Sequence, residues 1–169
     1  GRIMDKAMDA GIVCFDTADV YPQGRSAPGL TEEIIGRWLK GRRDSVILAT
    51  KAFGKVGPNA WDEGNSRKHL LDAIDASLKR LQTDHVDLYQ LHHHDPSTPI
   101  EETLEALDII VRSGRARHVG VCNFLAYRLA QFLGKAESRG LVRVISAQPR
   151  YNLLFREMER ELFPLCMEE

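Results

Sequence analysis

Five short apolar runs alternate with longer helical patterns, and this alternation constrains the fold more than any other feature of the chain. The runs are rich in Val, Ile, Leu or aromatic residues and are too short for typical helices; they cover 12–18, 46–51, 86–92, 117–123 and 143–148. Such runs are typical of strands buried on both faces of a sheet. Strands that alternate with helices predict βαβ units, and therefore an α/β fold built on a parallel sheet.

Start and stop signals place the intervening helices. Ser66 is a good N-cap for a helix whose apolar residues keep helical spacing up to Leu81. Thr98 is the expected N-cap of the next helix, because Pro99 then occupies the first helical position and Gly114 a stopping position. Two further helices are expected, over 31–41 and from about 125 to 140.

The connections between the predicted strands separate two parallel architectures. No strand is followed by a glycine-rich GxGxxG turn, which argues against a doubly wound dinucleotide-binding fold. The (β/α)8 barrel is then the leading architecture, although a full barrel takes roughly 250 residues and eight strands. This chain of 169 residues shows five strands, begins inside one helical pattern and ends inside another. The sequence therefore predicts a single partial barrel domain over 1–169, truncated at both ends.

Charge and cysteine content narrow the classes of partner and compartment. Net charge is −1 with 28% charged residues of both signs, so no basic surface for nucleic acid is expected. No run of 18 apolar residues occurs, so no membrane partner is expected. Three scattered cysteines form neither a disulfide framework nor a CxxC motif, which favours a reducing cytoplasm. No feature of the sequence indicates an oligomer, and none forbids one.

Polar residues stand at the carboxyl ends of the predicted strands, where the catalytic groups of a barrel are expected. They are Asp16, Lys51, His92, Asn123 and Gln148, and Tyr21 follows Asp16 in the next loop. A charged Asp and Lys that end neighbouring buried strands need each other, but alone they fit a structural ion pair as well as a functional one. A tyrosine beside the Lys51 ammonium is expected to have its pKa lowered from about 10 toward the range of a general acid. An imidazole at His92 could hydrogen-bond a substrate oxygen.

Five motifs in order along the chain resemble those of the aldo-keto reductases: FDTADVY (15–21), ATK (49–51), DLYQLH (87–92), GVCNF (120–124) and AQPRYN (147–152). The resemblance implies a (β/α)8 barrel, of which this chain would be about strands 2 to 6. It also implies that NADP(H) binds in an extended pose across the strand ends without a Rossmann motif, which agrees with the absent GxGxxG turn. The segment DLYQLHHHD and the long insert after FDTADVY are more similar to the bacterial and potassium-channel-β-subunit-like branches than to mammalian aldose reductases.

The resemblance assigns roles to the strand-end residues. In that family Asp, Tyr, Lys and His form a catalytic tetrad, and the matching positions here are Asp16, Tyr21, Lys51 and His92. The implied reaction reduces an aldehyde or ketone to an alcohol, with hydride from the nicotinamide and a proton from Tyr21. Lys51 and Asp16 would tune Tyr21, and His92 would orient the carbonyl. The implied partner is a small-molecule carbonyl substrate.

The implied cofactor contacts fall on Asp16, Cys122, Asn123 and Gln148. Asn123 and Gln148 match family positions that hydrogen-bond the nicotinamide carboxamide, although alone Asn123 fits a strand-end turn and Gln148 a satisfied core amide. Cys122 stands where the family usually has a serine, and a thiol is a weaker donor and acceptor than a hydroxyl. A preference for NADP over NAD is implied only by the resemblance to the family.

Three consecutive histidines, His92 to His94, raise the question of a metal site. The resemblance selects His92, which ends DLYQLH. On an extended strand alternate residues share a face, so His92 and His94 are expected to point together and His93 away from them. A metal site there would need further ligands, and no Cys or carboxylate pattern with metal spacing is nearby, so no metal is expected. His93 and His94 would line the substrate entrance or be solvated.

Two alternatives to a carbonyl reductase stay open at this point. One is a channel-β-subunit-like protein whose main role is to bind a partner and sense the state of its cofactor. The other is an inactive fragment of a reductase that lacks a complete cofactor site. The tetrad residues alone do not separate these alternatives from an enzyme, and the variable loops that would define a substrate are not decisive either.

Overall fold

The computed structural model describes residues 1–24 and 27–169, whose strands form one curved parallel sheet. The sheet order is β1-β2-β3-β4-β5, and each strand pairs with the next along the chain. The strands are β1 Cys14–Asp16, β2 Ile47–Ala52, β3 Val86–Leu91, β4 Ala116–Cys122 and β5 Val144–Gln148. The predicted α/β class with a parallel sheet is therefore confirmed.

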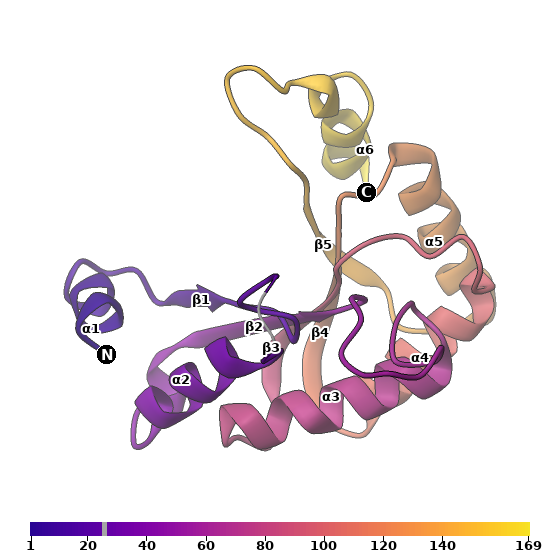
Figure 1. Ribbon diagram of the computed structural model, residues 1–169. Coiled ribbons are helices and arrows are strands. Elements are labelled where there is room, and N and C mark those ends of the chain that lie inside the picture. The colour runs from indigo at the N-terminus through magenta and orange to yellow at the C-terminus, as the bar shows by residue number, and fades with distance from the viewer. Residues whose placement is uncertain (25–26) are drawn as a thin grey trace.

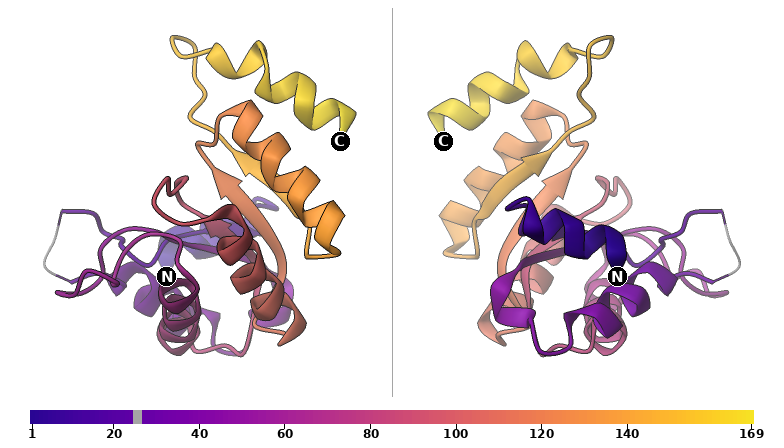
Figure 2. Two further views of the ribbon diagram at one scale, coloured as in Figure 1. Left: turned by 90° about the vertical axis from the view of Figure 1, so that its right-hand side faces the viewer. Right: turned by 90° about the vertical axis from the view of Figure 1, so that its left-hand side faces the viewer.

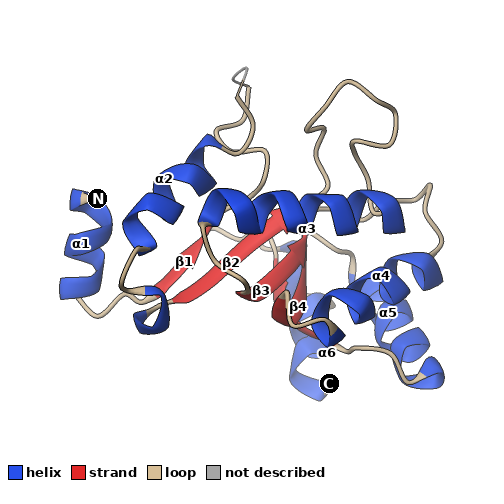
Figure 3. Ribbon diagram, turned by 90° about the horizontal axis from the view of Figure 1, so that it is seen from below, coloured by secondary structure: helices blue, strands red, loops and turns tan. Residues whose placement is uncertain are grey.

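A helix precedes the first strand and a helix follows each strand, and helices α2 to α5 lie along the outer, convex face of the sheet (Figures 1 and 2). The α-helices are α1 Arg2–Asp9, α2 Leu30–Leu39, α3 Arg67–Leu81, α4 Ile100–Arg112, α5 Ala126–Arg139 and α6 Leu162–Glu168, with short 3-10 turns η1 Arg43–Ser45 and η2 Glu157–Glu159. Figure 3 shows α2, α3 and α4 following one another around the sheet. Strands of neighbouring order with helices on one outer face are the arrangement of part of a (β/α)8 barrel. No described helix is long and apolar enough to cross a bilayer.

The helix boundaries confirm one predicted cap and correct another. Ser66 caps α3, because its hydroxyl accepts a hydrogen bond from the His69 amide at 3.2 Å. The predicted cap of α4 is wrong: Pro99 is the N-cap residue, and no side chain caps this helix. Thr98 instead donates its hydroxyl to Asp95 Oδ2 at 2.7 Å, because that carboxylate already organises the turn before the helix.

The apolar core lies between the sheet and helices α2 to α5. Leu48, Leu70, Ile74, Leu91 and Leu107 are completely buried there. The expectation that every strand is buried on both faces is wrong for the two outer strands. Cys14 and Asp16 of β1 are exposed, and Ile145 of β5 is 58% exposed. Each outer strand has a neighbour on one side only, so one edge of it is uncovered within the described chain.

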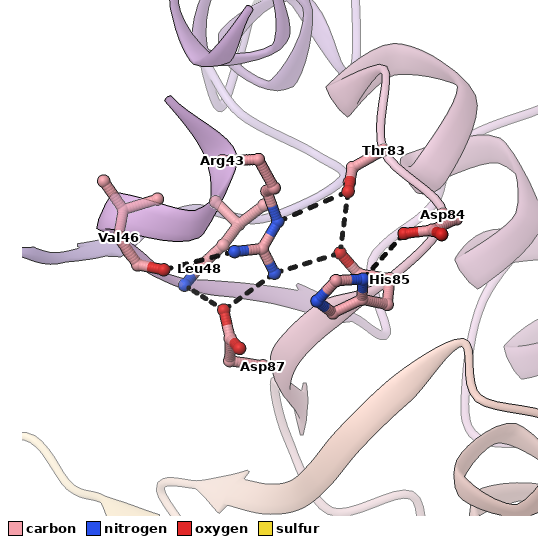
Figure 4. A network of polar contacts seen from close by, with 7 residues as sticks. All are labelled: Arg43, Val46, Leu48, Thr83, Asp84, His85 and Asp87. Carbon is pink, nitrogen blue, oxygen red and sulfur yellow. Dashed lines mark hydrogen bonds and ion pairs between the residues drawn. The ribbon is translucent and has the colours of Figure 1, made fainter. Parts of the chain in front are cut away.

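A polar network joins the amino-terminal ends of β2 and β3 (Figure 4). Arg43 donates to Asp87 Oδ2 at 2.8 Å, to the Val46 carbonyl at 3.1 Å and to the His85 carbonyl at 3.2 Å. Asp87 Oδ2 also accepts the Leu48 amide at 2.8 Å. These bonds connect the strand starts to each other and to the preceding turns. In a barrel this end contributes stability, which leaves the carboxyl ends of the strands for chemistry.

Candidate active site

The strand register brings Asp16 and Lys51 together at the carboxyl ends of β1 and β2. Asp16 pairs with Ala49, and Lys51 lies two residues further along β2 on the same face. The Lys51 ammonium donates to Asp16 Oδ2 and, at 2.9 Å, to the carbonyl oxygen of Thr17. The Lys51 side chain is only 2% exposed, so this carboxylate provides the charge partner that a buried ammonium requires.

Tyr21 and His92 pack beside this ion pair. The Lys51 Nζ atom lies 5.7 Å from the centre of the Tyr21 ring. The His92 ring meets the Tyr21 ring edge to face, with 5.8 Å between ring centres. Tyr21 comes from the loop after β1 and His92 directly follows β3, so four residues from three separate segments meet at one end of the sheet.

Tyr21 does not show the pKa shift that its lysine neighbour suggests. The pKa of Tyr21 is raised above its usual value of 10.0, mainly by burial and further by the negative charge of Asp16. The expected lowering is therefore wrong for this chain. The physical reason is that Asp16 and the Thr17 carbonyl already engage the ammonium, which faces the Tyr21 ring at 5.7 Å. Tyr21 is accordingly a protonated phenol at neutral pH.

His92 is a neutral imidazole across the neutral range. Its side chain is largely buried, and burial lowers its pKa from 6.5 to about 4, with further lowering from Lys51 and His93. A neutral imidazole has one N–H donor and one acceptor nitrogen. His92 can therefore donate a hydrogen bond without adding a second positive charge beside Lys51.

The three histidines do not alternate as an extended strand would place them. Strand β3 ends at Leu91, and the His92 and His93 rings stack with 5.3 Å between centres and 15° between planes. His94 instead packs edge to face against Phe124 at 5.6 Å. The expectation that His92 and His94 point together is therefore wrong, because the chain turns at the end of the strand. No group of three or more His, Cys, Asp or Glu residues among the described part of the chain could hold a metal ion.

Asn123 directly follows β4, Gln148 ends β5, and the two residues are joined through the backbone. The Asn123 amide donates to the Gln148 carbonyl at 3.1 Å, and Asn123 Oδ1 accepts the Arg150 amide at 2.9 Å. Asn123 has a φ of 55°, in the left-handed region that asparagine tolerates better than most residues. Gln148 Nε2 donates to Asp16 Oδ2 at 3.2 Å, which links this amide directly to the ion pair.

Cys122 is a buried, protonated thiol in the same cluster. It is 1% exposed, and burial raises the pKa of the thiol to about 12. Its Sγ atom lies 3.4 Å from Gln148 Oε1 and 3.7 Å from Gln90 Oε1. The single S–H proton can be donated to only one of these oxygens at a time.

Three buried polar residues were missed by sequence reasoning: Gln90 in the site itself, and Asp19 and Glu32. Gln90 is 3% exposed and donates to Asp16 Oδ1 at 3.1 Å. Strand periodicity could have found it, because Gln90 lies two residues before His92. Asp19 and Glu32 are buried carboxyl groups, and no sequence signal distinguishes them from solvated acidic residues.

Comparison of the chain with known proteins identifies its family. The model of the aldo/keto reductase family matches residues 1–169. An uncharacterized oxidoreductase of Bacillus subtilis, YrpG, is 43% identical over 175 residues, covering 99% of this chain and 53% of the relative. A putative aryl-alcohol dehydrogenase of Schizosaccharomyces pombe is 35% identical over 191 residues, covering 99% of this chain and 57% of the relative.

A third relative represents the channel-associated branch. A probable voltage-gated potassium channel subunit beta of Arabidopsis thaliana is 40% identical over 168 residues, covering 96% of this chain and 49% of the relative. The chain thus spans about half the length of the curated relatives it matches. The match over every residue and the clustered strand-end side chains agree with each other: the chain belongs to the aldo/keto reductase family, in the part of it that includes bacterial oxidoreductases and potassium-channel-β-like proteins.

Proposed function

We propose that the protein is an NADP(H)-dependent oxidoreductase that reduces aldehyde and ketone carbonyls, and that this chain forms about strands 2 to 6 of its barrel. The observation that carries the proposal is the cluster of the Lys51–Asp16 ion pair, Tyr21 and His92 at the carboxyl ends of the strands. Family membership and the oxidoreductase names of relatives support the general class of reaction. The name of the fission-yeast relative makes aromatic aldehydes the first substrates to try.

The side chains at the ends of β4 and β5 fit a nicotinamide carboxamide. A primary amide presents two donors and an acceptor, and the amides of Asn123 and Gln148 can complement both kinds of group. Both side chains are exposed, and they sit at adjacent strand ends. One N–H of Gln148 Nε2 is bound to Asp16, so its second N–H and its Oε1 atom are the groups available to a carboxamide. Asp16 and Cys122 adjoin these amides, so they would be the neighbouring residues that hold the cofactor there.

A bound nicotinamide would supply the hydride. Tyr21 would donate its phenolic proton to the carbonyl oxygen, and its raised pKa keeps that proton in place until it is needed. Lys51 would stabilise the negative charge that the phenol oxygen acquires as the proton leaves. Asp16 would hold the ammonium in position, and the neutral imidazole of His92 would donate a hydrogen bond to the carbonyl oxygen.

Replacement of Tyr21 tests the proposal in the full-length gene product. Tyr21→Phe should lower the rate of benzaldehyde reduction by about 10²- to 10⁴-fold, the usual effect of losing a positioned general acid. NADPH affinity, measured by fluorescence titration, should stay nearly intact. Tyr127→Phe is a matched control, because Tyr127 is 52% exposed on α5. A Tyr21 variant that keeps more than half of the wild-type turnover would show that the proton donor is wrongly assigned, and titration with NADH and NADPH side by side decides the cofactor.

A second candidate function is favoured by the identity to the Arabidopsis channel subunit. In that case the protein would bind a partner and sense the redox state of its cofactor, with slow turnover. The two functions are separated by measuring steady-state turnover on simple aldehydes and binding of candidate channel cytoplasmic domains. Fast turnover without partner binding supports the reductase, whereas partner binding with negligible turnover supports the sensor.

A further inference from the structure

Gln90 lies in the middle of the polar cluster, between Asp16 and Cys122. It pairs with Lys51 across β2 and β3 and with Gly120 across β3 and β4, so all three positions lie in one row of the sheet. Its side chain is almost fully buried, at 3% exposure. The Gln90 Nε2 atom donates to Asp16 Oδ1 at 3.1 Å, and its Oε1 atom lies 3.7 Å from Cys122 Sγ. The amide nitrogen is therefore engaged by Asp16, and the amide oxygen is one of the two acceptors within reach of the Cys122 thiol.

The sheet makes room for this amide. A Cβ atom at Gly120 would lie 3.2 Å from Gln90 Cγ and 3.3 Å from Gln90 Oε1, closer than ordinary contacts. The same Cβ would lie 2.3 Å from Ser146 Oγ, the next residue in the row. The missing side chain at Gly120 thus leaves the space in which Gln90 reaches back toward Asp16.

The two oxygens of Asp16 are held by different groups. Oδ2 accepts Lys51 and the exposed Gln148, whereas Oδ1 accepts the buried Gln90. Gln148 is also the amide that would contact the proposed cofactor, so its hold on Asp16 is shared with that second role. Gln90 is enclosed by the sheet and has no such second role. It would therefore remain on Asp16 throughout a catalytic cycle.

We propose that Gln90 is a positioning residue: it fixes the Asp16 carboxylate, and through it the Lys51 ammonium, beside Tyr21. This inference rests on the proposed reductase function. A neutral amide suits the task because it orients the carboxylate without changing the balance of one anion to one cation. A second cation would compete with Lys51 for Asp16, and an apolar residue would remove the fixed donor from Oδ1.

Two near-isosteric variants of the full-length protein test the proposal. Gln90→Met keeps the length of the side chain but removes the donor, and it should lower kcat for aldehyde reduction by about tenfold to a hundredfold, as expected for a misplaced catalytic group. Cofactor affinity should remain within about twofold of wild type, because only a transition-state interaction is lost. Gln90→Glu should be impaired at high pH, where the introduced carboxylate repels Asp16. It should recover as the pH falls and the introduced carboxyl group, once protonated, can donate to Oδ1.

Ser146→Ala is the matched control, because Ser146 occupies the same row and its hydroxyl is buried without a partner in the described chain. It should have wild-type kcat. Wild-type kcat in Gln90→Met would overturn the proposal. The proposal would also be overturned if both Gln90 variants lost kcat equally at every pH, in proportion to a loss of thermal stability. That result would mark a purely structural role.

Crystal structures of the wild type and of Gln90→Met test the role of Gln90 independently of the proposed function. A wild-type protein without any carbonyl reductase activity would refute the reductase function. The Gln90→Met structure would still test the contact: the Asp16 carboxylate should rotate away from its wild-type orientation. An unchanged Asp16 conformation would overturn the positioning role, whatever the activity.

Discussion

Asp19 is a buried carboxyl group, and its replacement by asparagine is expected to stabilise the protein at neutral pH. The residue is 1% exposed, and neither oxygen has a well-formed hydrogen bond within the described chain. Burial raises its pKa from 3.8 to about 8, with a further contribution from Glu32, while Arg80 and nearby backbone amides offset this only in part. Asp19 thus remains protonated in the folded protein at pH 7.

The magnitude follows from the difference between the folded and unfolded pKa values. Between pH 3.8 and about 8 the folded state holds a proton that the unfolded state has lost, so stability falls as the pH rises through this window. At about 1.4 kcal/mol per pH unit, the loss reaches about 4 kcal/mol at pH 7. An asparagine does not titrate, and its unpaired amide costs about as much as the unpaired protonated carboxyl group. Asp19→Asn should therefore gain about 2 to 4 kcal/mol at pH 7 and almost nothing at pH 4.

Denaturant unfolding of the full-length wild type and Asp19→Asn between pH 4 and 8.5 measures this difference. The gap between the two free energies of unfolding should widen steadily with pH. Asp72→Asn is the control, because the Asp72 side chain is 66% exposed, and its effect should stay below about 0.5 kcal/mol at every pH. The protonated state of Asp19 would be contradicted if the difference in free energy of unfolding did not depend on pH, or if the variant were less stable at pH 7. Either result would mean that Asp19 is ionised in the folded protein.

Three further outcomes are expected. In steady-state assays His92→Ala should lower turnover far more than His93→Ala or His94→Ala, and chelators should have no effect; stoichiometric zinc lost together with activity would contradict this. Cys122→Ser should leave NADPH affinity equal or better by less than about 1.5 kcal/mol, because a hydroxyl is a stronger donor than a thiol; a large loss in a fluorescence titration would show that the site depends on sulfur. The isolated 169-residue chain should associate and lack reductase activity, because both outer strands have an uncovered edge; a monodisperse, active monomer in light scattering would refute this.

Much of the fold could be predicted because local patterns and tertiary structure agree. Short apolar runs gave the positions of the five strands, and the cap at Ser66 is formed as its sequence context predicts. The cap at Thr98 could not be predicted, because Asp95 competes for its hydroxyl. Asp95 accepts bonds from Thr98, Ser97 and the Asn65 amide, and the last of these lies 30 residues away in sequence. A local capping rule cannot include such a distant partner.

In the candidate site, too, some features could be predicted from the sequence and others depend on tertiary contacts. Residues at strand ends could be placed from topology alone, since parallel strands bring their carboxyl ends to one edge. The pKa direction of Tyr21 could not, because it depends on whether the Lys51 charge is free or already engaged. The orientations of His93 and His94 depend on where β3 ends. Each failure concerns a distance of a few ångströms, which sequence spacing does not define.

The contacts between Asp16, Lys51 and Tyr21 matter because of the charges in the cluster. Asp16 and Lys51 contribute one negative and one positive charge, whereas the raised pKa of Tyr21 and the lowered pKa of His92 keep both rings neutral at pH 7. Under the proposed reaction, negative charge would appear on the Tyr21 oxygen as its proton leaves. Among the residues of this cluster, Lys51 is the cation placed to offset that negative charge. Lys51 can do so only while Asp16 keeps the ammonium beside Tyr21 without drawing the ammonium away. The amide donors on Asp16 spread its negative charge, so they weaken its hold on Lys51 at the moment when Tyr21 needs that ammonium.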